Sequence, residues 1–224
     1  DETKHFYSYG MGPSTGDDSR SIALWIKTGS KDKMIICSTS PRFGGGKSLF
    51  DLQLNDGKLS FINANGNLLK TKNTQLNDGK WHHIACVLPE NKKRVKDILL
   101  YVDGEPQKTF CKDQEAVINT RPNNVLIIGD HVRSIVKNKN SRDEYKRFTG
   151  RVDDYGYWVI PLTGAMVKAL YQAESSELNY PIQDMRKLIK LYKEKKGKVQ
   201  IDAIVWEYED GIKGVPGKIT QKNN

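Results

Sequence analysis

The chain has 224 residues, of which 37% are hydrophobic and 28% charged, so it can bury a substantial core and is too apolar for a disordered segment. No apolar run approaches the roughly 20 residues that a membrane-spanning helix needs, so we expect no membrane insertion. The formal net charge of +9 favours anionic partners, although lysines also simply keep a surface soluble. Aromatic residues are not interleaved with the lysine-rich runs as a stacking platform would require, so we expect no nucleic-acid partner.

Short apolar runs separated by turn residues dominate the first 160 residues, a pattern typical of an all-β sandwich or barrel. Asp-Gly dipeptides, which readily form tight hairpin turns, stand between several of the runs. Two such turns explain why LNDGK occurs at both 54–58 and 76–80, and the flanking sequences do not otherwise match, so a duplicated domain is not supported. The expected strands are 21–28, 33–39, 48–55, 58–64, 67–73, 81–88, 97–103, 107–112, 124–130 and 147–160.

The apolar period changes from two residues to a helical one after residue 160. A short helix is expected to start near Thr163, with one apolar side formed by Met166, Val167, Leu170 and Tyr171.

The last fifty residues carry a further helical pattern and one more strand pattern. The predicted helix covers 180–197, with Pro181 in its first turn and lysines near its end, and the predicted strand covers 198–211. We therefore expect a sandwich over residues 1–173 and a helix–strand extension over residues 174–224 that packs on it.

A glycine-rich stretch, RFGGGKS at 42–48, imitates a phosphate-binding loop. The nucleotide-binding pattern needs a glycine where Pro41 stands and a helix afterwards, whereas the following residues alternate as a strand. Three glycines let the backbone approach a ligand closely, so we expect a binding loop at the rim of the sandwich.

Two adjacent histidines, His82 and His83, precede Cys86 in the sequence WHHIACVL. If this run is a strand, the two imidazole rings point to opposite faces, and one metal ion could not easily bind both. Apolar residues on both faces predict a strand that is covered on both sides. We interpret the histidines as structural, bonded to backbone or carboxylate groups, rather than as a metal or catalytic site.

The three cysteines, Cys37, Cys86 and Cys111, allow at most one disulfide within the chain. Each lies in an apolar run, where a buried thiol behaves as a small hydrophobic group. No Cys or His spacing indicates zinc.

The strand RVDDYGYWVI places Asp153, Tyr155 and Tyr157 on one face and Asp154 on the other. Whichever face is inward then carries an aspartate, which must be hydrogen-bonded or bind a cation. Hydrogen bonding is the default, and a structural Ca²⁺ held by Asp153 with loop carbonyls is the alternative. We expect no other cofactor.

Catalytic patterns have little support in the sequence. The paired-carboxylate spacing Glu-x-Asp-x-x-Glu of sandwich glycosidases is absent, and Glu207 and Glu209 lack a tyrosine–histidine constellation around them. No nucleophile elbow, HExxH motif or EF-hand loop is present, so an enzyme is not favoured.

Four segments together resemble the laminin-G-like, pentraxin-like branch of the concanavalin A-like lectin/glucanase superfamily. They are SIALWIKT, LNDGKWHHIACVL, ILLYVDGE and GRVDDYGYWVIPLTGAMVKALY, and the similarity spans 19–172. The resemblance implies a two-sheet antiparallel jelly-roll sandwich, with a C-terminal helix and an extra strand here, and a non-catalytic binding role in secreted or surface proteins.

Three features depart from that resemblance. The segment after NVLIIGDH lacks the acidic cluster that forms the paired calcium site in pentraxins, and no cysteine stands near Ala23 to pair with Cys86. The helix and strand after Leu178 also extend beyond the usual module.

We therefore expect a secreted, periplasmic or cell-surface carbohydrate-binding module that favours anionic glycans. A start at Asp1 fits a trimmed mature protein or an excised domain. A protein-binding or adhesion domain is the alternative, and a glycoside hydrolase or polysaccharide lyase is the third possibility. Arginine grips carboxylate or sulfate and tyrosine stacks on sugars, so the expected ligand-binding residues are Arg42, Lys47, Arg133, Arg142, Tyr145 and Lys146.

Overall fold

The computed structural model describes residues 6–8, 14–41, 49–63, 66–120, 124–130, 146–175 and 204–205. The predicted helix at 180–197 and most of the predicted final strand lie outside these residues. The division into 1–173 and 174–224 therefore stays a prediction.

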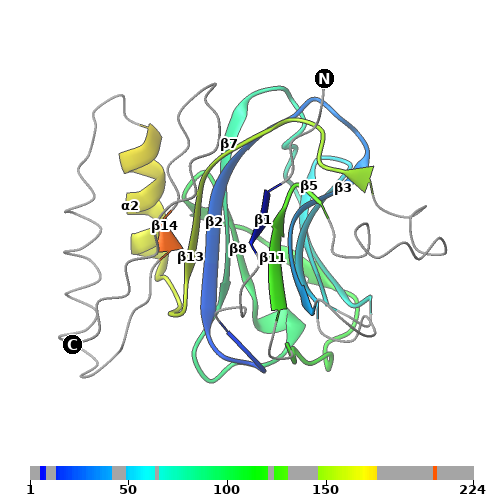
Figure 1. Ribbon diagram of the computed structural model, residues 1–224, viewed down its shortest axis with the longest axis vertical. Coiled ribbons are helices and arrows are strands. Elements are labelled where there is room, and N and C mark those ends of the chain that lie inside the picture. The colour runs from blue at the N-terminus through cyan, green and yellow to red at the C-terminus, as the bar shows by residue number, and fades with distance from the viewer. Residues whose placement is uncertain are drawn as a thin grey trace.

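The described strands form two sheets that face each other (Figure 1). All strand pairs are antiparallel except a short parallel contact of β12 with β3. This arrangement confirms the predicted all-β, two-sheet sandwich.

The eight-stranded sheet runs in the order β1 (Phe6–Ser8), β11 (Asn124–Ile128), β3 (Lys33–Pro41), β4 (Phe50–Asn55), β5 (Lys58–Asn63), β6 (Leu68–Thr71), β10 (Thr109–Cys111), with β12 (Lys146–Arg147) beside β3. The six-stranded sheet runs β14 (Ile204–Val205), β13 (Arg151–Trp158), β2 (Arg20–Lys27), β7 (Trp81–Leu88), β8 (Leu99–Val102), β9 (Glu105–Pro106).

The main core lies between the two sheets, and a 3₁₀ turn, η1 (Val95–Asp97), closes one end with its buried Val95. Alternate residues of each strand supply the core, as expected for a sheet with one inward face. Core residues from the two sheets include Ile22, Leu24, Ile26, Ile84, Cys86, Phe50, Leu52, Leu54, Leu59 and Phe61.

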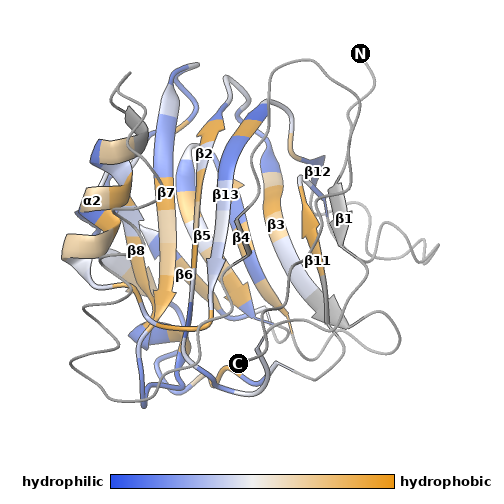
Figure 2. Cartoon of the chain, turned by 60° about the vertical axis from the view of Figure 1, so that its left-hand side comes forward, coloured by the Kyte–Doolittle hydropathy of each residue, from blue (hydrophilic) through white to orange (hydrophobic). Residues whose placement is uncertain are grey.

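The helix α2 (Gly164–Ser175) covers the outer face of the six-stranded sheet (Figures 1 and 2). Thr163 caps its start, because its hydroxyl oxygen accepts a hydrogen bond from the Met166 amide at 3.2 Å. The predicted apolar side is used as expected: Met166, Val167 and Leu170 pack on Ala85 and the strand neighbours of Ala85.

Both faces of strand β7 are apolar because each face is covered by another layer of the structure. Ile84, Cys86 and Leu88 point into the main core, while Ala85 and Val87 lie under α2. His82 and His83 follow the same alternation, so the prediction that their rings point to opposite faces is confirmed.

The predicted alternation fails at one place in β13. The pairing with β2 shifts between Asp153 and Gly156, and Asp154 has a left-handed φ of 47°. This β-bulge adds one residue, so Val152 and Tyr155 both reach the main core. The expectation that one aspartate must face inward is therefore wrong. Asp153 lies opposite Trp25 on the outer face instead.

Candidate functional site

Of the predicted ligand-binding residues, Arg42, Lys47, Arg133, Arg142 and Tyr145 lie outside the described residues. Their role stays a prediction.

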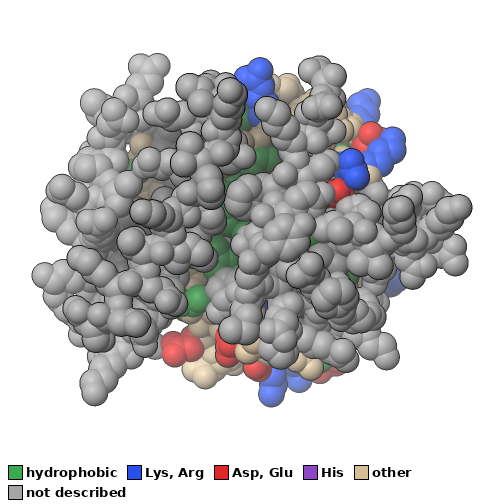
Figure 3. All heavy atoms as spheres, in the orientation of Figure 1, with side chains coloured by type: hydrophobic (Ala, Val, Ile, Leu, Met, Phe, Trp, Pro, Cys, Tyr) green, Lys and Arg blue, Asp and Glu red, His purple; other side chains and the backbone are tan. Residues whose placement is uncertain are grey.

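Lys146 is described and belongs to β12. Its ammonium nitrogen lies 2.8 Å from Asp32 Oδ1, and this hydrogen bond lowers the pKa of Asp32 below its usual value. The neighbouring Arg147 Nε lies 3.0 Å from a carboxylate oxygen of the buried Asp130. Figure 3 shows cationic and anionic side chains together at the upper right, the corner where β12 lies in Figure 1. The Lys146 charge is thus already balanced by a carboxylate.

The outer face of the eight-stranded sheet carries polar side chains where the inner face is apolar. Ser38, Asp51, Gln53 and Ser60 are all buried there, and the Ser38 hydroxyl donates to Asp51 Oδ1 at 2.7 Å. Ser60 pairs across the strands with Lys70 and so continues this polar face toward the sheet edge. Among the residues described on this face, the exposed ones lie at the edge of the sheet.

At that edge, Phe110 of β10 lies directly opposite Lys70 of β6. The Phe110 side chain is 58% exposed, although the neighbouring Cys111 and its partner Leu69 point into the core. An exposed phenylalanine on the outer face of an edge strand cannot contribute to this core.

Lysines surround Phe110 on the same face. The β6–β10 ladder continues at both ends, because the Lys72 amide donates to the Lys108 carbonyl at 3.0 Å and the Lys112 amide donates to the Leu68 carbonyl at 3.2 Å. Side chains two residues apart share a face, so these lysines point outward with Lys70. We call this surface the lysine–phenylalanine patch: Lys70, Lys72, Lys108, Phe110 and Lys112.

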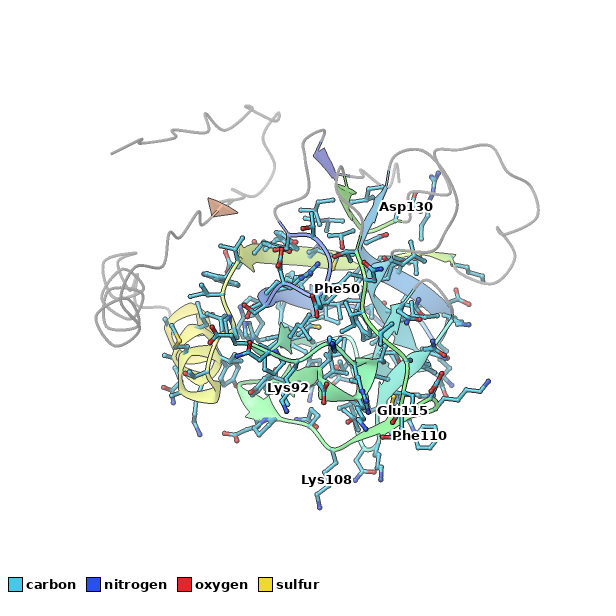
Figure 4. The ribbon with its side chains drawn as sticks, turned by 90° about the horizontal axis from the view of Figure 1, so that it is seen from below. Phe50, Lys92, Lys108, Phe110, Glu115 and Asp130 are labelled. Atoms are coloured by element: carbon cyan, nitrogen blue, oxygen red, sulfur yellow. The ribbon has the colours of Figure 1, made fainter. Side chains whose placement is uncertain are left out.

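The charges of the patch are not balanced within the described part of the chain, where no salt bridge involves these lysines. Lys72 and Lys108 stand opposite each other, and like charges in that position destabilise a sheet. Figure 4 shows Lys108 and Phe110 pointing outward at the lower edge of the molecule. The nearby Glu115 carboxylate is held elsewhere, by Arg94 at 2.7 Å and Lys96 at 3.7 Å. An anion with an apolar or ring-shaped body would complement this surface.

Sequence reasoning missed the patch, although a signal was present. Residues 68, 70 and 72 and residues 108, 110 and 112 alternate with inward residues, and four of the six are lysine. Only the pairing of β6 with β10 brings the two sets together, because 36 or more residues separate them along the chain.

No site of three or more metal-binding side chains occurs among the described residues. Asp153 Oδ1 accepts a hydrogen bond from the Asp154 amide at 2.9 Å. This contact is the local hydrogen bonding expected as the default, and calcium at Asp153 stays a prediction.

His82 is held between two carboxylates, as the structural interpretation predicts. Its Nδ1 lies 2.9 Å from Asp103 Oδ2, and its Nε2 lies 3.1 Å from Asp78 Oδ1. The hydrogen bond that His82 makes to the Asp103 carboxylate and the further contact with Asp78 raise the pKa of His82, against the opposing effect of burial.

Residues 6–168 match the model of the concanavalin A-like lectin/glucanases superfamily, and the chain belongs to this family. A comparison with curated proteins gave no significant match.

Solved structures with the same fold include three with low sequence identity. The native heptameric SAP-like pentraxin from Limulus polyphemus is 18% identical with a TM-score of 0.55, over 75% of each chain. Domains LG4-5 of the mouse laminin alpha1 chain are 19% identical with a TM-score of 0.52, over 72% of this chain and 40% of that chain. A proposed carbohydrate binding protein from Bacteroides ovatus is 14% identical with a TM-score of 0.50, over 74% of this chain and 44% of that chain.

No helix in the described part of the chain combines the length and apolar character needed to cross a membrane.

Proposed function

We propose that this domain is a non-catalytic carbohydrate-binding module and that the lysine–phenylalanine patch binds anionic glycans. The observation that carries the proposal is the exposed Phe110 among four outward lysines that lack carboxylate partners in the described structure. A sulfate or carboxylate group would balance the ammonium charges, and the face of a sugar ring would cover the phenyl ring.

The family supports a binding role, since it contains lectins, and a similar fold occurs in a proposed carbohydrate binding protein. The formal net charge of +9 supports an anionic ligand. A location outside the cytoplasm, secreted, periplasmic or on the cell surface, is part of the same proposal.

Lysines on an edge strand have a second use, because they discourage edge-to-edge pairing with other molecules. This protective role requires no ligand and does not require an aromatic side chain among the lysines. A binding experiment therefore separates the two roles.

The test compares retention of the chain on immobilised heparin, polygalacturonate and dextran. We expect retention on an anionic polysaccharide that falls with added salt, and none on neutral dextran. The double variant Lys70→Glu/Lys108→Glu should lose most of the retention on heparin. Absence of retention of the wild-type chain on every polysaccharide would overturn the proposal.

The matched control is Lys92→Glu/Lys93→Glu, which replaces two exposed lysines outside the patch. Each Lys→Glu change replaces a positive charge with a negative one and lowers the net charge by two, so both double variants lower the formal net charge from +9 to +5. Equal losses in the two variants would show that net charge, rather than the patch, determines retention. A wild-type chain that instead captures a protein in parallel pull-downs, without binding glycan, would favour the adhesion alternative.

A further inference from the structure

A second polar–aromatic surface lies on the outer face of the six-stranded sheet, beyond the helix. Lys27 of β2 stands directly between Trp81 of β7 and Arg151 of β13, because it pairs with both. One row further along the sheet, Trp25 stands between His83 and Asp153. We call Lys27, Trp81, Arg151 and Asp153 the Trp81 patch.

These side chains all face away from the main core. Directly paired residues share a face, and residues two apart on one strand share it too. Ala23, two residues before Trp25, contacts the helix cluster, which fixes the outward direction for the whole set. The β-bulge places Asp153 here, since without the extra residue it would be on the side of Tyr155.

The patch is open to solvent, and one side of it is walled by aromatic rings. The Trp81 side chain is 37% exposed and Arg151 is exposed, while Lys27 and Asp153 are half-buried. Figure 2 shows the start of β7 extending beyond α2. The wall is formed by Trp25 and Tyr171, whose rings stack with centroids 5.7 Å apart.

The wall carries no charge. His83 packs behind Trp25 with ring centroids 5.5 Å apart, and burial lowers the pKa of His83 to about 4. The imidazole is therefore neutral at physiological pH and does not compete for an anion. Gly104 has no side chain, which leaves room for the Tyr171 ring, because an added Cβ would lie 3.0 Å from Tyr171 Cδ1.

From this arrangement we infer a second glycan site, at which the Trp81 patch binds a uronic-acid residue of a polysaccharide. The indole of Trp81 offers an apolar face for the sugar ring, and Asp153 can accept hydrogen bonds from sugar hydroxyls. Arg151 and Lys27 supply the cations for the sugar carboxylate, with the planar guanidinium suited to a two-point contact. Arg151 and Trp81 lie two strand spacings apart, about 10 Å, which leaves room for one sugar ring and its carboxylate.

This inference rests on the proposed carbohydrate-binding function but uses a different sheet and different residues. The lysine–phenylalanine patch presents flexible point charges around one ring. The Trp81 patch combines a large indole, a carboxylate acceptor and a guanidinium, a set that recognises a sugar ring and its acid group together. Two sites on opposite sheets would let one domain bridge two polysaccharide segments.

The test measures binding of a defined oligogalacturonate by isothermal titration calorimetry, and of the same oligosaccharide with its carboxyl groups methyl-esterified. The background is the Lys70→Glu/Lys108→Glu variant, so that the first patch does not contribute. We expect Trp81→Leu to weaken binding of the free acid about tenfold. Arg151→Gln should weaken binding of the acid but not of the ester. The control is Leu99→Ala, which removes another exposed apolar side chain, 44% exposed, from the same sheet.

Unchanged far-UV circular dichroism and melting temperature of Trp81→Leu show that the variant folds. If the background variant binds oligogalacturonate and Trp81→Leu binds it equally well, the Trp81 patch is not the site and the inference fails. If the wild-type chain binds heparin but no oligogalacturonate, the inference fails and the proposed function stands. If the wild-type chain binds no polysaccharide, both fail.

Discussion

His82 of β7 lies against Asp103 of the β8–β9 hairpin turn, with 2.9 Å between His82 Nδ1 and Asp103 Oδ2. The other carboxylate oxygen of Asp103 accepts the backbone amide of His83, also at 2.9 Å. The imidazole reaches Asp78 on its far side. A single histidine thus ties the Asp-Gly turn before β7 to the Asp-Gly turn after β8.

This geometry makes the free energy of unfolding depend on pH. The folded-state pKa of His82 is raised above the unfolded value near 6.5. The stabilisation is therefore fully present below the unfolded pKa and is lost as the pH rises through the folded pKa. We expect His82→Gln to cost about 1 kcal/mol at pH near 5.5 and less as the pH approaches about 8.5. Urea unfolding of both proteins across this range measures the difference. A difference that stays constant with pH would contradict the prediction.

Arg20 is a buried cation at the start of β2, and its guanidinium connects the segment before β2 to the core. Its Nε donates to the Asp18 carbonyl and its Nη1 to the Thr120 hydroxyl, both at 2.8 Å, and its guanidinium lies 5.0 Å from the centre of the Phe50 ring. Arg20→Met would remove both hydrogen bonds and leave the buried Thr120 hydroxyl without this donor. We expect a loss of about 3 kcal/mol in the free energy of unfolding, measured by urea denaturation. Arg94→Met, which breaks an exposed ion pair with Glu115, should cost less than about 1 kcal/mol.

Gly156 allows the indole ring of Trp158 to fold back over its own strand. A Cβ at residue 156 would come within 2.7 Å of Trp158 Cζ3, and Trp158 is buried under the helix cluster. We expect Gly156→Ala to destabilise the fold by about 2 kcal/mol through overpacking. Thermal unfolding and the near-ultraviolet circular dichroism of the tryptophans report this change. Gly29→Ala is the matched control because nothing lies within 4 Å of the added methyl group. Similar melting temperatures for the two variants would rule out the steric explanation.

The three cysteines are free thiols and all of them are buried. Burial raises the pKa of each thiol, so little of the reactive thiolate forms at neutral pH. We expect a negligible reaction with a thiol reagent in the folded protein and three equivalents after unfolding in guanidinium chloride. Rapid reaction of one thiol in the native protein would show that this thiol is accessible to solvent in the folded state.

The sequence alone determined the fold class and most strand positions of this chain. The two-residue period of runs such as 21–28 and 81–88, and the Asp-Gly turns between strands, are local signals that need no partner. The opposite directions of His82 and His83 follow from the same period. The helix at 164–175 was equally readable, because Met166, Val167 and Leu170 recur at helical spacing.

Only the tertiary structure decided which surface residues meet. The β-bulge at Asp154 gives no clear sequence signal, and it sends Asp153 outward to lie beside Trp25 instead of inward beside Tyr155. Lys70 and Phe110, or Lys27, Trp81 and Arg151, are distant in sequence and become neighbours through strand pairing. Strand periodicity is local, so it can assign each residue to a face, but a binding surface is made from several strands and depends on their order and register.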